Sequence, residues 1–233
     1  MIPGRASMCE GAARARRQRG RGKRIAGILA MAMAAAFGIA RAESVSILQD
    51  GDTSAWVERR FKGSTVYETV ALDGRTAVRA ASEESASGLF RKVRVDIGRM
   101  PILRWSWRVE AALNGLDERT REGDDYRARV FVIRNRPTPA RMMSALNYVW
   151  SRSVEKGAHW RSPYSHAVRM VALRSGNGEA GRWVHERRDV RADFRTLLGR
   201  EVGYIHGIAI MTDSDDTGGA AVAYYGDIRF ASE

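Results

Sequence analysis

Two adjacent carboxylates, Asp124 and Asp125, are candidate catalytic or ligand-binding residues in this 233-residue chain. Paired carboxylates act as general acid and base, or accept hydrogen bonds from sugar hydroxyls. They precede an extended segment that carries Arg127 and Arg129, so an ion pair that fixes the loop is the alternative interpretation. Because consecutive strand residues face opposite sides, the two share a site only if the chain bends there.

A second group of aromatic side chains flanks a polar loop from Ser151 to Ser165. Flat aromatic faces pack against the C–H surfaces of sugars, while polar groups fix the orientation. Anchoring the loop to the core is the other common use of such residues. Together with the carboxylates they form the predicted ligand-binding set: Asp124, Asp125, Tyr148, Trp150, His159, Trp160 and Tyr164.

A third group lies in the acidic loop Asp213-Ser214-Asp215-Asp216-Thr217-Gly218-Gly219. Several carboxylates in one short loop are typical ligands for a hard cation such as calcium. The spacing begins like an EF-hand loop, but its twelfth position is Tyr224 instead of Glu, so the bidentate ligand is missing. A solvated turn, in which Asp and Gly are favoured for backbone reasons, is the alternative.

Other chemistries find no support in the sequence. It has no Gly-x-Ser-x-Gly nucleophile motif and no Gly-x-x-x-x-Gly-Lys-Ser/Thr phosphate-binding loop. The string from His185 to Asp189 ends in Asp, where a metalloprotease helix carries its second His. No recognisable catalytic nucleophile remains, and the interpretation leans away from an enzyme.

The segment from Arg14 to Ala42 predicts the cellular location of the protein. A basic run ending at Arg24 precedes an uncharged stretch from Ile25 to Ala40, and Ala40-Arg41-Ala42 has the small-x-small form of a cleavage site. This pattern is typical of a secretory signal peptide over residues 1–42, with a periplasmic or secreted mature chain that starts at Glu43. The stretch is too short and too rich in Ala and Gly for a membrane span, so none is expected after cleavage.

Removing the leader changes the charge of the protein. Nine of the 39 Lys and Arg residues and one of the 27 Asp and Glu residues precede Glu43, so the mature charge is about +4 instead of +12. Nucleic acid is therefore not an expected partner. The single cysteine, Cys9, also lies in the leader, which leaves the mature chain without a disulfide or thiolate ligand.

The elements that must position these side chains are predominantly strands. Leu103, Trp105, Trp107 and Val109 alternate with polar residues, which places them on one buried face. Asp73-Gly74 between two such runs predicts a two-residue hairpin. The predicted strands are 65–72, 75–81, 88–95, 103–109, 128–134, 146–150, 167–174, 183–189, 204–211 and 221–230.

One short helix is expected from Asp189 to Leu198, capped by Asp189 and stopped by Gly199. About ten strands without intervening helices predict an all-β fold, an antiparallel two-sheet β-sandwich of the jelly-roll type. The absence of a composition break predicts a single domain over residues 43–233.

Four strings together resemble the bacterial domain-of-unknown-function family 3047, over about Trp56 to Phe230. They are Gly123-Asp124-Asp125-Tyr126-Arg127-Ala128-Arg129-Val130, Leu146-Asn147-Tyr148-Val149-Trp150, Gly207-Ile208-Ala209-Ile210-Met211-Thr212-Asp213-Ser214-Asp215 and Ala223-Tyr224-Tyr225-Gly226-Asp227-Ile228. The resemblance implies an exported single-domain protein and no particular reaction.

The expected architecture also resembles carbohydrate-binding, galactose-binding-like jelly-roll modules. In these modules an Asp on the last strand lies beside an early strand, often next to a structural calcium. This resemblance adds Asp227 to the predicted calcium ligands, which are Asp213, Asp215, Asp216 and Asp227.

The leading hypothesis is a non-catalytic exported protein that binds a saccharide or another small polar envelope ligand at the aromatic loop. One alternative is a glycoside hydrolase or lyase that uses Asp124 or Asp125 with His159 or an Arg. The other is an envelope interaction module, which requires a large apolar surface and no concave pocket. The oligomeric state is left open.

Overall fold

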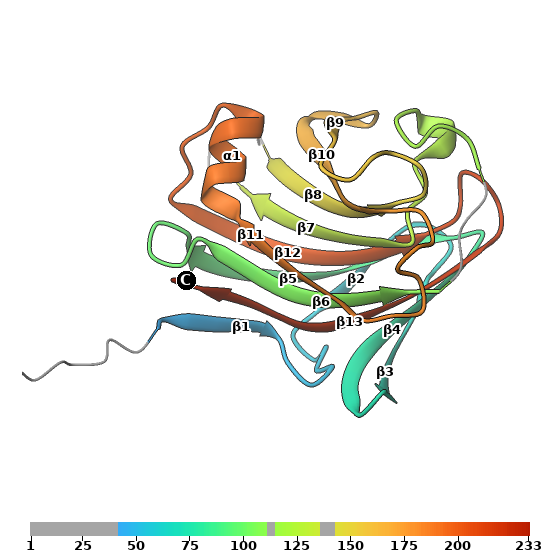
Figure 1. The fold of residues 1–233 in the computed structure, drawn as a ribbon, viewed down its shortest axis with the longest axis horizontal. Coiled ribbons are helices and arrows are strands. Elements are labelled where there is room, and N and C mark those ends of the chain that lie inside the picture. Colours follow the sequence, from blue (N-terminus) through green and yellow to red (C-terminus); the bar gives the residue numbers. More distant parts are fainter. Residues whose placement is uncertain (1–41, 111–114, 136–142) are drawn as a thin grey trace, which may run out of the picture. The chain divides into compact units, whose positions relative to one another are not determined.

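The computed structural model describes residues 42–110, 115–135 and 143–233. These residues form two β-sheets, and buried and exposed side chains alternate along their strands. The predicted leader lies outside the described residues, apart from Ala42. The described residues fall within one compact unit. Its two sheets and their strands are labelled in Figure 1.

Sheet A has six strands, and all its pairs are antiparallel. In spatial order they are β11 (Val184–Asp189), β6 (Ile102–Val109), β13 (Ala220–Ala231), β4 (Arg75–Glu83) and β3 (Val66–Leu72). The sixth strand, β1 (Ser44–Leu48), pairs with the far end of β13.

Sheet B has seven strands. In order they are β2 (Val57–Lys62), β5 (Ala86–Asp96), β12 (Tyr204–Asp213), β7 (Ala128–Arg134), β8 (Ser144–Ser151), β10 (Ser165–Ser175) and β9 (His159–Ser162). One pair corrects the antiparallel prediction, since β8 and β10 run parallel. The strand β9 runs antiparallel to β10. The loop after β8 and β9 therefore return the chain to the starting end of β8, and β10 can run in the same direction as β8.

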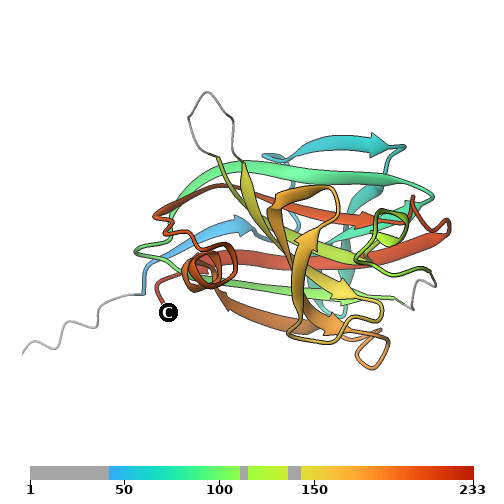
Figure 2. The ribbon, with the colours of Figure 1, turned by 90° about the horizontal axis from the view of Figure 1, so that it is seen from above.

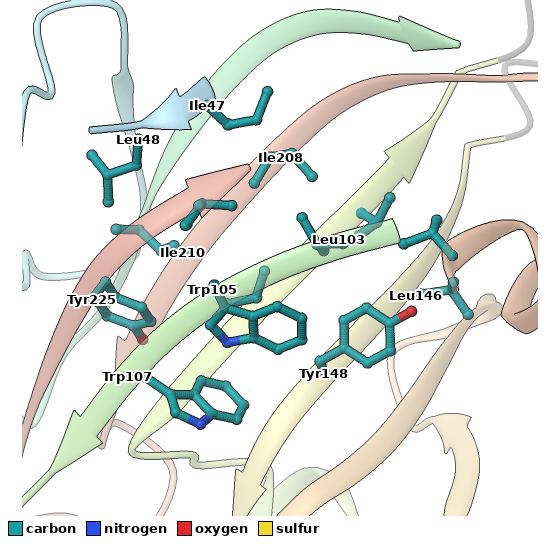
Figure 3. Close-up of a cluster of buried hydrophobic side chains, with 14 of the residues drawn as sticks. Ile47, Leu48, Leu103, Trp105, Trp107, Leu146, Tyr148, Ile208, Ile210 and Tyr225 are labelled. Carbon is teal, nitrogen blue, oxygen red and sulfur yellow. The ribbon is translucent and has the colours of Figure 1, made fainter. Parts of the chain in front are cut away.

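The core lies between the sheets, and its centre is aromatic. Trp105 and Trp107 on β6 are buried as predicted, and they meet Tyr148 and Trp150 on β8 with ring centroids 5.4 Å and 5.9 Å apart. Figure 3 shows Trp105 and Tyr148 facing each other across the two layers. Fully burying an apolar side chain contributes about 1.5–3 kcal/mol, so this contact between sheets is a major source of cohesion.

Two local predictions are confirmed in detail. Asp73 and Gly74 both adopt positive φ angles, 52° and 74°, between the paired residues Leu72 and Arg75. That conformation is the mirror-image turn that an Asp-Gly pair favours in hairpins. The helix α1 (Val190–Leu198) begins after Asp189, whose carboxylate accepts from Ala192 N, and ends at the left-handed Gly199.

Three strands were absent from the prediction: β1, β2 and β9. They are short, with four to six residues, and every residue of β2 is at least partly exposed, so the apolar alternation is weak there. A single turn of 3₁₀ helix, Arg121–Gly123, precedes β7. The helix α1 packs beside β10 and β11 at one end of the sheets (Figures 1 and 2). Within the described ranges, no helix has the length and apolar character needed to cross a membrane.

Candidate functional site

The predicted carboxylate Asp124 lies in a buried ion-pair network. The Arg129 guanidinium on β7 contacts Asp124 Oδ2 at 3.2 Å and Asp213 Oδ2 at 2.6 Å, and all three side chains are almost fully buried. The same guanidinium lies over the Tyr126 ring, 4.2 Å from its centroid. This is the ion pair expected as the alternative for Asp124, and it also engages Asp213.

One arginine compensates two carboxylates in this network. Asp124 Oδ1 is buried and has no hydrogen-bond partner among the described residues. Burial raises the pKa of Asp124, and it raises the pKa of Asp213 well above its usual value, because an ionised carboxylate loses its hydration there. The network stabilises the loop before β7 and gives neither carboxylate an open face for a ligand.

The second predicted carboxylate, Asp125, binds the acidic loop. Its Oδ1 accepts from Asp216 N at 3.2 Å, and its Oδ2 accepts from Thr217 N at 2.6 Å and from Thr217 Oγ1 at 2.5 Å. Ligand oxygens of Asp125, Asp215 and Asp216 lie within 4.8 Å of one another, which is close enough to share a cation. The described cluster does not include Asp213 or Asp227.

Tyr164 joins this acidic cluster. Its hydroxyl donates to Asp216 Oδ2 at 3.1 Å, and Arg121 lies 5.3 Å from the centroid of its ring. Burial and the neighbouring Asp216 raise the pKa of Tyr164 to about 12. Burial, followed by the charges of Asp216 and Asp125, raises the pKa of Asp215. A bound cation would remove this carboxylate repulsion.

The other predicted ligand residues lie apart from the acidic cluster. Tyr148 and Trp150 belong to the core, where the Tyr148 hydroxyl donates to Asp193 Oδ2 at 2.6 Å and Trp150 Nε1 donates to the Gly176 carbonyl at 3.1 Å. Trp160 packs against a smaller cluster on the outer side of β8 and β10. His159 lines a separate depression of about 200 Å³. The predicted ligand set therefore splits between core, acidic cluster and surface.

A groove of about 600 Å³ lies on the outer face of sheet A. Strands β11, β6 and β13 supply its floor with the side chains that alternate away from the core. These are His185, Arg104, Ser106 and Arg229, with Gly226 and Asp227 beside them. The alternation that buries Trp105 and Trp107 thus places a polar set on the opposite face.

The tip of the β3–β4 hairpin forms a wall of this groove. Asp73 and Arg75 line it, and both contact residues of distant strands. Asp73 accepts from Arg108 Nη1 of β6 at 2.8 Å, and the Arg75 guanidinium lies 4.8 Å from the Trp183 ring just before β11. The hairpin therefore bends across the outer face of the sheet, as Figure 1 shows at lower right.

Gly226 keeps the floor of the groove open. The register of β13 against β6 shifts between Tyr225 and Ile228, which marks a bulge at Gly226 and Asp227. A Cβ atom at Gly226 would lie 2.2 Å from Ser106 Oγ and 3.5 Å from the Trp183 ring. Glycine within a strand commonly marks such a close approach, and here it leaves room beside Ser106.

Two aromatic side chains lie close to the groove without lining it, and one of them, Trp183, packs against the wall residue Arg75. The Trp183 and Tyr224 rings lie 6.4 Å apart, and both side chains are partly exposed. Trp183 Nε1 has no hydrogen-bond partner among the described residues. A polar floor next to a Trp and a Tyr has the composition that binds amphipathic ligands such as sugars.

Asp227 lies in the groove and not with the other predicted calcium ligands. Its Oδ1 accepts from Asp50 N at 3.2 Å, and Asp50 adopts a positive φ of 50° in the loop after β1. The side chain thus holds the turn of an early segment against the last strand. Asp50 also lines the groove.

A family model described as "Protein of unknown function (DUF3047)" matches residues 54–229. The chain belongs to this family. Among the described strands, the matched range of the DUF3047 domain leaves out only β1 and the last two residues of β13, and it includes the groove floor together with the hairpin tip. No curated protein matches the sequence.

Solved structures with similar coordinates share little sequence with this DUF3047 chain. A family 11 carbohydrate-binding module of a Clostridium thermocellum cellulase has 9% identity and a TM-score of 0.44, covering 81% of this chain and 94% of the module. A family 30 module from the same organism has 12% identity and a TM-score of 0.45, covering 82% and 98%. The xyloglucanase domain of NopAA from Sinorhizobium fredii has 8% identity and a TM-score of 0.43, covering 74% and 91%.

Sequence reasoning missed the groove, although its signal was present. The alternation from Leu103 to Val109 places the intervening polar residues Arg104 and Ser106 on the outward face of the strand, and Asp73-Gly74 predicts the hairpin. What no local pattern reveals is that the hairpin bends over two strands to meet Arg108 and Trp183. That contact creates the concavity.

Proposed function

We propose that this exported protein binds a saccharide or another small polar ligand, without catalysis, in the groove on the outer face of sheet A. One observation carries the proposal: a groove of about 600 Å³ whose floor is polar, where Gly226 leaves room beside Ser106 and where Trp183 lies next to the wall residue Arg75. Volumes of about 300–1,000 Å³ are typical of sites for small ligands.

The residue types favour a saccharide among polar ligands. Arg104, Ser106 and His185 offer hydrogen-bond donors for hydroxyl groups from three positions on neighbouring strands. The Trp183 ring lies next to the groove wall and offers to a sugar the part of its surface that Arg75 and Tyr224 leave exposed. The site is built on strands, which hold these groups at fixed spacing.

The two alternatives of the sequence analysis gain less support. A hydrolase at Asp124 or Asp125 needs open carboxylates, whereas Arg129 and Thr217 engage them and neither lines the groove. An interaction module was expected to lack a concave pocket, and the described part of the chain has one.

The cellular location and the cation are parts of the same proposal. The leader pattern supports export with cleavage after Ala42, and N-terminal sequencing of protein from a periplasmic fraction tests it. The cluster of Asp125, Asp215 and Asp216 supports a structural calcium. Calcium added at 5 mM is expected to raise the melting temperature of wild type but not of Asp216→Asn; an equal response of both contradicts the site.

The binding experiment compares two tryptophans by calorimetry against a panel of neutral and charged oligosaccharides. Trp183→Ala removes aromatic surface at the groove and is expected to weaken binding by about tenfold, since stacking of this kind contributes roughly 1–1.5 kcal/mol. Trp160→Ala is the matched control on sheet B and leaves affinity unchanged. Loss of binding only in Trp160→Ala would move the site to the aromatic loop, and no binding at millimolar ligand would refute the proposal.

A further inference from the structure

Three arginines lie in direct register across three neighbouring strands of sheet A. Arg104 of β6 pairs with Arg187 of β11 on one side and with Arg229 of β13 on the other. All three belong to the outward-facing set of their strands. Within residues 42–110, 115–135 and 143–233, none of them has an acidic side chain within 4.0 Å.

The acidic groups of the groove are engaged elsewhere. Asp73 pairs with Arg108 at 2.8 Å, and Glu186 pairs with Arg174 at 2.7 Å while accepting from Trp107 Nε1 at 3.1 Å. The other two acidic lining residues accept from neutral groups, Asp227 from the backbone of Asp50 and Asp50 from Gln49 Nε2 at 3.4 Å. None of the four acids of the groove thus pairs with Arg104 or Arg229.

This arrangement has an energetic cost in the free protein. Like charges directly opposite each other on a sheet face repel, and neighbouring strands lie well within the Debye length of about 8–10 Å. Exposed arginines often tolerate such pairing because water solvates them. Arg161 of β9 faces Arg169 of β10 in the same way, but the Arg169 guanidinium donates to the Leu197 carbonyl at 3.0 Å.

Arg104 differs from a solvated surface arginine because it is partly buried and lines the groove floor together with Arg229. Two guanidinium groups on adjacent strands present donor forks to the same space. Such forks match the planar oxygens of carboxylates and the oxygens of phosphate groups. An anion between them would supply the compensating charge that the described chain does not.

We propose that the groove selects an anionic saccharide, whose carboxylate or phosphate ester is bound by Arg104 and Arg229. Arg187, in register beside Arg104, lines the neighbouring depression with His159 and adds to the positive field. This inference rests on the proposed function, because it names the class of saccharide that the same groove binds. The bond is non-covalent, and no reaction of the ligand is involved.

The experiment measures binding of matched ligands to the purified mature protein by calorimetry. Trigalacturonate carries carboxylates, and its fully methyl-esterified form has the same sugar rings without charge. Galactose 6-phosphate, galactose and inorganic phosphate form the second series. The anionic member of either saccharide pair is expected to bind at least about tenfold more tightly than its neutral counterpart, as for charge-assisted hydrogen bonds. Raising NaCl should weaken only the anionic ligand.

Variants assign this preference to residues. Arg104→Gln and Arg229→Gln should each reduce affinity for the anionic saccharide by about tenfold and leave affinity for the neutral one nearly unchanged. Arg161→Gln, which removes a cross-strand arginine outside the groove, should alter neither. A circular dichroism melt of each variant shows that it is folded before binding is measured.

The outcomes separate this inference from the proposed function. Equal affinity for charged and neutral saccharides would overturn the anionic preference while the saccharide proposal stands. Binding of inorganic phosphate as tight as that of any sugar would overturn the saccharide part. If no saccharide binds in either form, both proposals fail. A preference for anions that persists in both groove variants but disappears in Arg161→Gln would place the anion outside the groove.

Discussion

Arginine is used in opposite ways in the two charged regions of this domain. In the network before β7, Arg129 is buried and contacts two carboxylates, Asp124 and Asp213. In the groove on sheet A, Arg104 and Arg229 face each other without an acidic partner among the described side chains. The buried region has two carboxylates for one arginine, and the groove has arginines without acidic partners.

The difference separates structural from functional charge. A buried ion pair that has its partners stabilises one loop conformation and offers nothing to a ligand. Charges that are held in place on rigid strands without partners are available for binding.

The largest expected effect comes from breaking the buried network. Arg129→Met leaves Asp124 and Asp213 buried without a cation, and we expect it to lower the free energy of unfolding by about 3–5 kcal/mol. Urea denaturation measures this. The exposed Arg161→Met serves as control and should change stability by less than about 0.5 kcal/mol. Similar losses in both variants would show that the buried network has no special role.

The next effect concerns the open floor of the groove. Gly226→Ala places a Cβ atom 2.2 Å from Ser106 Oγ, and we expect a loss of about 1–3 kcal/mol together with weaker ligand binding. In the double variant with Ser106→Ala the nearest Ser106 atom would be its Cβ, at 3.5 Å, so stability should largely return. Additive losses in the double variant would refute this steric account.

The pH dependence of stability tests the charge imbalance of the buried region. Burial raises the folded-state pKa of Asp124 above its unfolded value near 3.8, so the native state binds more protons in that interval. The stabilising contribution of this group is complete below pH 3.8 and is lost as the pH rises through the folded-state pKa.

Asp124→Asn cannot ionise and should remove this part of the pH dependence. Relative to wild type, its free energy of unfolding should increase between pH 4 and pH 8, as measured by urea titrations at each pH. A difference that is constant with pH, or that falls as pH rises, would show that Asp124 has no raised pKa.

The smallest effect is expected in the groove. Arg104→Gln removes repulsion from both neighbouring strands, so the ligand-free protein should gain about 0.2–1 kcal/mol of stability. Thermal and urea melts at low salt measure the change, and 1 M NaCl should reduce it by screening. A loss of stability would instead assign Arg104 a structural partner.

Local patterns predicted most of the fold because they act over few residues. The alternation around Trp105 and Trp107, the Asp73-Gly74 turn and the capped helix after Asp189 all depend on neighbours in the sequence. The strand β2 was missed since its exposed side chains show no apolar alternation. The parallel pairing of β8 and β10 depends on where β9 lies, which no local pattern specifies.

The candidate site was harder to predict because it depends on contacts between distant segments. Tyr148 and Trp150 have the residue types of a sugar site, yet their position opposite Trp105 and Trp107 makes them core. Arg75 and Trp183 are more than a hundred residues apart in the chain and meet only because the hairpin bends. The predicted ligand-binding roles of Asp125 and Tyr164, and the predicted calcium at Asp215 and Asp216, remain predictions.

The most direct test of the central claim is a crystal structure of the mature protein soaked with an anionic oligosaccharide such as trigalacturonate. We predict ligand density on the outer face of sheet A, with a carboxylate within hydrogen-bonding distance of Arg104 and Arg229 and a ring beside Trp183. Density over Trp160 and Tyr164 on sheet B, or an empty groove at saturating ligand, would contradict it.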